Sequence, residues 1–107
     1  MSGAQSGPLT RALQAEIDGF PGKTLVFPLT CTPWASITFA GARHHLMLEW
    51  TGPGAAGAAA EFFGRMGDIQ FALPGQIVAD LALLADHRRD DGAYAALEIE
   101  LLTIEDK

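Results

Sequence analysis

The sequence has little with which to build a covalent or metal-bound framework. Cys31 is its only cysteine, so the 107 residues cannot form an internal disulfide. It contains none of the spacings that typically bind zinc, such as C-x-x-C or H-E-x-x-H, and its N-terminal MSGAQSG has neither the basic nor the apolar region of a signal peptide. A solitary cysteine is typical of reducing compartments. We therefore expect a cytoplasmic protein that holds no metal ion and no cofactor.

Basic residues are also scarce. Seven lysines and arginines stand against 13 acidic residues, which gives a formal net charge of −6, and only Arg88 and Arg89 are adjacent. Binding to a phosphate backbone requires several clustered bases, so nucleic acids and anionic membranes are poor candidate partners. A long hydrophobic run is missing as well. Two prolines and a glycine interrupt the uncharged stretch from Thr24 up to Arg43, which argues against a membrane-spanning helix there.

What the sequence does contain is the patterning of one small α+β domain. Residues 1–7 suggest a flexible N-terminal arm, and residues 8–107 suggest a single domain. Leu9, Leu13 and Ile17 form one stripe of a short helix that opens at Pro8, and a second helix is expected over 56–66. Strands are expected over 24–31, 35–39 and 42–50, in 69–86 with a bend at Pro74-Gly75, and over 93–104. The predicted order α-β-β-β-α-β-β describes a mainly antiparallel sheet of four to five strands with two short helices packed on it.

The segment 51–63, TGPGAAGAAAEFF, contains a G-x-G-x-x-G pattern formed by Gly52, Gly54 and Gly57. In a dinucleotide site such glycines follow a buried parallel strand, and the amides at the start of the next helix bind the pyrophosphate. Here Pro53 removes one of these amides, and the preceding strand carries charged residues on one face. We therefore interpret the segment as a structural corner from which a helix begins.

The histidines do not form a metal site by their spacing. His44 and His45 are adjacent on a predicted strand, so their side chains point to opposite faces. His44 shares its face with apolar residues up to Trp50, which favours a buried, hydrogen-bonded histidine. A Cys31–His44 nucleophile would require the two strands to pair in the right register, and also a third, orienting group that the sequence does not identify. The sequence therefore assigns no catalytic residue.

Asp80 interrupts the apolar segment QIVADLALLAD, and the length of the hairpin loop that follows decides which face it occupies. A three-residue loop, Asp90-Asp91-Gly92 with a left-handed Gly92, directs Asp80 outward near Leu102. The same loop sets two inner pairs, Leu81 with Leu101 and Leu83 with Ile99. A two-residue loop, Asp91-Gly92, shifts the register by one and buries the carboxylate. Because an unpaired buried carboxylate is costly, we predict the three-residue loop and an outward Asp80.

The predicted outer face of the sheet is too apolar for a face that contacts water, since it carries Val78, Ala82, Leu84, Ala96 and Leu102. A two-fold homodimer is the commonest way to cover such a surface. Aromatic residues and methionine are enriched in interfaces, and the candidate contact residues are Trp34, Met47, Trp50 and Tyr94. We therefore expect a non-enzymatic protein that associates with itself or with another protein. The alternative is a small-molecule-binding protein or enzyme with a pocket between sheet and helix, which would use His44, Asp80 and Cys31.

Overall fold

The computed structural model describes residues 7–71, 73, 75–89 and 91–105. Most of the expected arm over residues 1–7 therefore lies outside the described residues. So do Pro74 of the expected bend and Asp90 of the expected hairpin loop. No helix among the described residues is long and apolar enough to cross a membrane.

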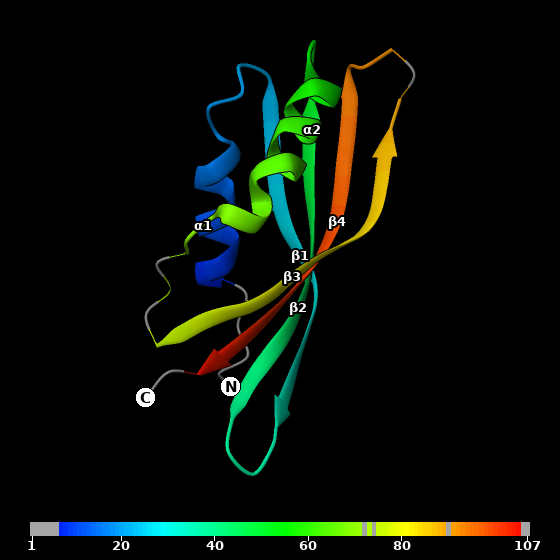
Figure 1. The fold of residues 1–107 in the computed structure, drawn as a ribbon. Coiled ribbons are helices and arrows are strands. Elements are labelled where there is room, and N and C mark those ends of the chain that lie inside the picture. The colour runs from blue at the N-terminus through cyan, green and yellow to red at the C-terminus, as the bar shows by residue number, and fades with distance from the viewer. Residues whose placement is uncertain (1–6, 72, 74, 90, 106–107) are drawn as a thin grey trace.

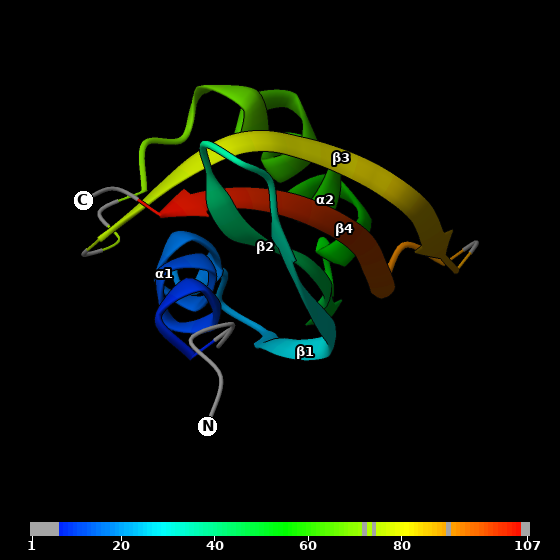
Figure 2. The same cartoon turned by 90° about the horizontal axis from the view of Figure 1, so that it is seen from below.

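In the described part of the chain, the fold consists of two α-helices, one short 3-10 helix and four strands. The elements are α1 (Gly7–Ile17), β1 (Lys23–Ala35), β2 (Ala40–Thr51), α2 (Ala55–Arg65), the short 3-10 helix η1 (Met66–Asp68), β3 (Gln76–Arg88) and β4 (Tyr94–Glu105). The sheet order is β1-β2-β4-β3, and every neighbouring pair is antiparallel. Figure 1 shows α2 lying over the central strands with α1 beside it, and Figure 2 shows the pronounced curvature of β3 and β4. The predicted α+β class, with an antiparallel sheet and two short helices, is confirmed.

The first hairpin has one strand fewer than expected. β1 runs without a break to Ala35, and residues 36–39 form the turn, closed by a bond from the Ser36 amide to the Phe39 carbonyl oxygen (2.7 Å). Two prolines fit within β1 because it is an edge strand, where one side of the backbone needs no N–H donors. A bulge between Pro28 and Thr30 interrupts the pairing with β2. The segment expected as a separate strand over 35–39 is therefore mostly turn.

The core lies between the helices and one face of the sheet. β2 follows the predicted alternation, with buried residues at every second position from Ala42 to Trp50. Leu9, Leu13 and Ile17 are the buried residues of α1, as their spacing predicts. Both helices belong to the same hydrophobic cluster as the inner residues of β2 and β4. Both helices therefore cover the same side of the sheet.

The register between β3 and β4 matches the prediction at its centre. Leu81 pairs with Leu101, Leu83 with Ile99, and Asp80 with Leu102, and Gly92 is left-handed with a φ of 73°. Near the loop, however, Arg88 pairs with Ala95, so the connection is one residue longer than expected. A bulge between Leu83 and Ala85 removes the extra residue and restores the predicted pairing.

A second bulge changes the position of Val78. The pairing shifts between Val78 and Asp80, so Val78 lies opposite the buried Thr103 and packs against the core. Its predicted place on the outer face was wrong. The bulge adds one unpaired residue, and one residue is enough to turn a strand side chain to the other face.

The glycine corner begins α2, as the sequence analysis predicts. Gly52 and Gly54 have φ values of 130° and 88°, a region that side chains other than glycine rarely adopt. The Ala55 amide donates to the Gly52 carbonyl oxygen (3.1 Å), and the Ala56 amide donates to that of Gly92 (3.1 Å). Two of the amides that a phosphate group would need therefore already bind carbonyl oxygens of the protein.

Candidate functional site

The structure brings Cys31 and His44 together and adds a third residue. The two are paired across β1 and β2, and Sγ of Cys31 lies 3.4 Å from Nδ1 of His44. On the other side of the ring, Nε2 lies 3.1 Å from Oγ1 of Thr103. The Thr103 hydroxyl in turn donates to the carbonyl oxygen of Ala42 (3.3 Å). Because that hydroxyl hydrogen is used, Oγ1 accepts from Nε2–H, which leaves Nδ1 to accept from the thiol.

This arrangement favours a neutral histidine. His44 is 1% exposed, and its burial lowers the pKa of the imidazole. Thr103 has no charge with which to stabilise an imidazolium ion, whereas the carboxylate of a catalytic triad does so. The cluster thus has the geometry of a buried hydrogen-bonded histidine, the interpretation that the sequence favoured. Thr103 was missed because its side chain meets His44 only through the pairing of β2 with β4, although the alternation along β4 turns it inward.

Asp80 lies on the other side of the sheet. It is exposed and pairs with Leu102, which alternates with the buried Leu101 and Thr103. His44 points into the core on the opposite face. The structure therefore does not bring Asp80 and His44 into one pocket.

The centre of the outer face carries polar bonds between strands. Arg43 pairs with Glu100 (3.0 Å), and the Tyr94 hydroxyl donates to Glu49 (2.9 Å), which raises the pKa of Tyr94. Glu98 accepts from two imidazoles, one on β3 and one on β2. The two bonds, from His87 and His45, are each 3.0 Å long and hold the pKa of Glu98 below its ordinary value. This face is therefore less apolar than the sequence suggested.

The predicted contact residues are divided between the two faces. Met47 and Tyr94 lie among the outer polar groups and are partly buried. Trp34 lies at the far end of the same face, opposite Gly41. Trp50 is 1% exposed and belongs to the core, so its ring is not a surface contact.

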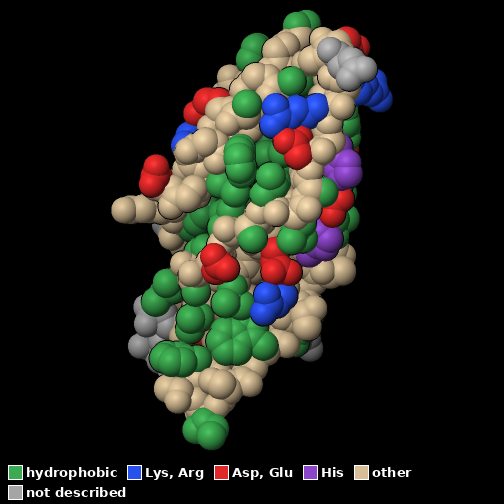
Figure 3. All heavy atoms as spheres, turned by 45° about the vertical axis from the view of Figure 1, so that its right-hand side comes forward, with side chains coloured by type: hydrophobic (Ala, Val, Ile, Leu, Met, Phe, Trp, Pro, Cys, Tyr) green, Lys and Arg blue, Asp and Glu red, His purple; other side chains and the backbone are tan. Residues whose placement is uncertain are grey.

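The two edges of the sheet differ in how they are protected. β1 carries two prolines, a bulge and Lys23, features that discourage pairing with another strand. β3 is equally long, with 13 residues, and has two bulges but no proline. Figure 3 shows the molecule with the right-hand side of Figure 1 turned forward, where hydrophobic side chains reach the surface in patches between scattered charges. Leu84, on β3, is 48% exposed.

A groove runs beside β3. It has a volume of about 490 Å³ and lies between the first half of the strand and the segment 66–71. Its apolar lining includes Met66, Ile69, Phe71, Val78 and Leu81, and its polar lining includes Gln70, Gln76 and Asp80. Leu81 and Leu83 point toward the core but are only partly buried. The inner side of β3 is therefore less completely covered than that of β2 and β4.

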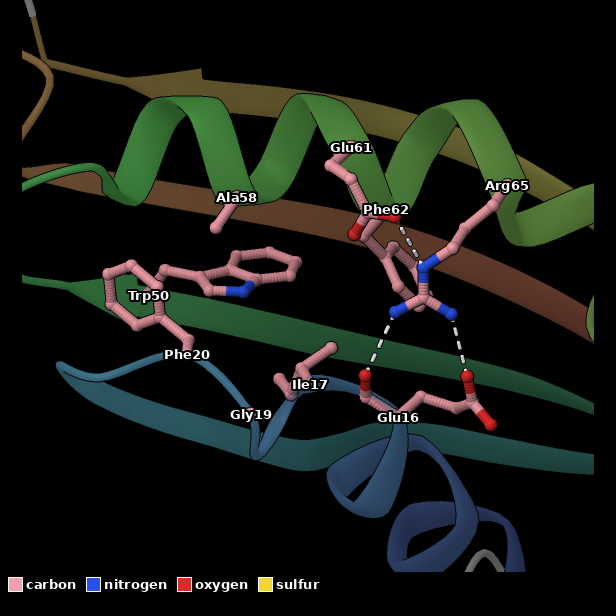
Figure 4. Close-up of a pocket in the computed structure, with 9 residues that line it drawn as sticks. All are labelled: Glu16, Ile17, Gly19, Phe20, Trp50, Ala58, Glu61, Phe62 and Arg65. Atoms are coloured by element: carbon pink, nitrogen blue, oxygen red, sulfur yellow. Dashed lines mark hydrogen bonds and ion pairs between the residues drawn. The ribbon is translucent and has the colours of Figure 1, made fainter.

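A second hollow lies between the two helices above the end of β2, where Trp50 closes its inner side (Figure 4). Its volume is about 350 Å³. Arg65 of α2 reaches across it to Glu16 of α1 and also bonds Glu61 of its own helix. This hollow lies between helices and sheet, but neither His44 nor Asp80 lines it.

No protein-family model matches this chain, and no curated protein matches it. Among the described features, the His44 cluster is neutral and buried, and Asp80 has no histidine partner. The β3 edge combines an open strand, an exposed leucine and a groove with apolar and polar residues in its lining.

Proposed function

We propose that the protein acts by association with a second copy of itself, through antiparallel pairing of the two β3 edges. The observation that carries this proposal is the open β3 edge, which is long, free of proline and bordered by a groove with both apolar and polar residues in its lining. A strand at the edge of a sheet presents unpaired N–H and C=O groups, so it is a ready template for another strand. Side chains of an added strand would enter the groove while the backbones pair.

The edge is better supported than the outer face as the contact surface. The centre of the outer face has polar bonds between strands, including the Arg43–Glu100 pair and the two imidazoles on Glu98. Such bonds allow a sheet face to contact water. The β3 edge has two bulges and Asp80 but no proline, and its exposed Leu84 and its half-covered inner leucines are apolar.

A second copy suits this edge because a two-fold axis sets β3 antiparallel to itself. In that arrangement the first half of one strand lies against the second half of the other. Asp80 is the one charged residue of the first half, while the second half carries the ion pair between Asp86 and Arg88. Antiparallel self-pairing therefore sets Asp80 of each copy against the second half of the other strand, apart from the partner's own Asp80. The product is one continuous sheet of eight strands, whose two outer edges are the protected β1 strands.

The test introduces a charge at each edge. Leu84→Lys places a lysine on β3, and Leu25→Lys places one on β1 at a position of nearly equal exposure, 48% against 51%. We expect the wild-type chain to have the mass of a dimer in light scattering. Leu84→Lys should raise the dissociation constant at least about tenfold, because the two-fold axis places an ammonium group instead of an apolar side chain at two positions of the interface, and each must lose water on pairing. Leu25→Lys should leave the constant unchanged.

Two results would overturn the proposal. One is a wild-type chain that remains monomeric at all accessible concentrations. The other is an equal loss of association in both variants. Hydrogen exchange gives an independent readout, because amides on the open side of β3 are protected only in the paired state, and Leu84→Lys should remove that protection while the amides of β2 keep theirs.

A further inference from the structure

The hollow between α1 and α2 has the size and lining of a small-molecule site. Its volume of about 350 Å³ falls within the range of such pockets. Its walls come from both helices, the turn after α1 and the end of β2, and none of its lining residues belongs to β3. It is therefore separate from the edge that we propose for association.

Arg65 closes one end of the pocket and is itself neutralised. Its Nη1 bonds Oε1 of Glu16 (2.7 Å), its Nη2 bonds the Glu16 carbonyl oxygen (2.9 Å), and its Nε bonds Oε2 of Glu61 (2.8 Å). The guanidinium also lies over the Phe62 ring, 5.4 Å from its centroid. Figure 4 shows these bonds bridging the two helices. The hydrogen bond that Arg65 donates to Glu16, followed by the one it donates to Glu61, raises the pKa of Arg65.

The charge left in the pocket is negative. Two carboxylates, Glu16 and Glu61, face one guanidinium, so the formal charge of the lining is −1. The C-terminal end of α1, at Ile17, adds the partial negative charge of its carbonyl groups. An anionic ligand is therefore disfavoured, and a cation is favoured.

Trp50 supplies a second, independent indication. Its side chain is 1% exposed, and it lines the pocket. Within the part of the chain that the structure describes, its indole N–H makes no hydrogen bond to the protein and is not fully enclosed, so this donor opens onto the pocket. Figure 4 shows the nitrogen on the side of the ring that faces Ile17 and Gly19. A ligand with an acceptor oxygen would satisfy it.

We infer that this pocket binds a small protonated amine that has a flat apolar body and a hydroxyl or carbonyl oxygen. The ammonium group is held by the carboxylates of Glu16 and Glu61, and the oxygen accepts from the Trp50 N–H. The apolar body lies against Phe20, which is partly buried, and Ala58. The class is that of aryl-substituted amino alcohols and amino ketones.

The test compares four probes of similar size that differ in charge and acceptor. They are 2-amino-1-phenylethanol, 2-phenylethylamine, 2-phenylethanol and 3-phenylpropanoate. Binding is followed by the NMR signal of the Trp50 indole N–H, which Trp34→Phe distinguishes from the signal of the one other tryptophan. We expect affinity to fall in the order given, with the amino alcohol bound at least about tenfold more tightly than the neutral alcohol.

Three variants assign the contacts. Glu61→Gln changes an exposed carboxylate and should weaken both amines about two- to fivefold, with no effect on 2-phenylethanol. Trp50→Phe keeps an aromatic ring but removes the N–H, so the amino alcohol should then bind no better than 2-phenylethylamine. Glu105→Gln is the matched control, because Glu105 lies at the opposite end of β4 from Ala95, the pairing partner of Trp50. It should change nothing.

The inference fails if neither amine shifts the Trp50 signal at roughly 10 mM, where a millimolar site is largely filled. It also fails if the carboxylate probe binds as well as the amines, or if Glu61→Gln and Glu105→Gln have the same effect. These outcomes do not depend on whether Trp50→Phe folds, because Glu61 is at the surface.

Discussion

At the scale of single residues, His44 couples the stability of the fold to pH. Burial lowers the pKa of His44 from its ordinary value of 6.5, so the native state resists a proton that the unfolded chain accepts. Above pH 6.5 the histidine is neutral in both states, and its contribution to stability is complete. As the pH falls below 6.5 toward the lower native pKa, that contribution is lost. Glu98 affects stability at lower pH than His44 does. The hydrogen bonds from His87 and then His45 lower the pKa of Glu98 from 4.5, so its contribution to stability is lost only as the pH falls below 4.5.

Replacing His44 should therefore flatten the pH dependence of stability in the range of histidine titration. We expect the wild-type free energy of unfolding to decrease between pH 7.5 and pH 5.5, and the decrease to be smaller in His44→Gln. Urea unfolding at three pH values across this range measures both slopes. An unchanged slope in His44→Gln would show that the histidine does not titrate differently in the native and unfolded states.

Some residue positions followed from the sequence, and others did not. The inward position of His44 and the outward position of Asp80 follow from strand alternation and the cost of burying a carboxylate. The Thr103 contact depends on the pairing of β2 with β4, strands that are separated by α2 and β3. Alternation gives the face of a side chain, but it does not give the neighbour across a strand pair. The pocket at Trp50 was missed for the same reason, since its walls come from two helices that meet only in the tertiary structure.

At the scale of elements, the sequence predicts the central pairing of β3 with β4 but not the two bulges in β3. The centre of the β3–β4 register follows from the need to bury Leu81 and Leu83 opposite Leu101 and Ile99. The bulges near Ala79 and Leu84 lie within a run of apolar residues, where no glycine or proline marks them. The bulge near Leu84 allows the hairpin loop to be one residue longer while the leucines at the centre of β3 keep their predicted pairing with β4. The first hairpin differs for a related reason, because an edge strand accommodates prolines that would interrupt a central one.

Strand packing at the start of β2 depends on a residue without a side chain. A Cβ on Gly41 would overlap the carbonyl oxygen of Thr103 in the neighbouring strand, and backbone atoms of paired strands cannot move apart without breaking the ladder. Gly41→Ala should therefore destabilise the fold by about 1–3 kcal/mol. Gly57→Ala is the matched control: Gly57 lies in α2 with open space around its Cα, and alanine there should stabilise the helix by about 0.5 kcal/mol. Chemical denaturation of the two variants should give shifts of opposite sign, and equal shifts would contradict this account of Gly41.

At the scale of the whole molecule, the helices cover the sheet unevenly. The chain is elongated, with principal extents of 49 × 25 × 21 Å. Figure 1 shows the end of the β1–β2 hairpin extending beyond both helices, and its turn carries the fully exposed Ile37. α1 packs on β1, and α2 packs on β2 and β4, which leaves β3 to the segment 66–71. The size and class of the fold were predictable from hydrophobic spacing. The uneven cover of the sheet was not predictable from the sequence, because it depends on where each helix lies on the sheet.

Association through β3 makes the stability of the molecule depend on its concentration. If two chains unfold from one dimer, a tenfold increase in concentration stabilises the dimer by about 1.4 kcal/mol, or about 0.7 kcal/mol per chain. For a chain of this size, that raises the thermal midpoint by about 3 °C. Scanning calorimetry over a hundredfold range should thus show a steady rise for the wild type and for Leu25→Lys, whereas the rise for Leu84→Lys should begin only at higher concentrations. A wild-type midpoint that does not move with concentration would mean that each chain folds alone, with the β3 edge open to solvent.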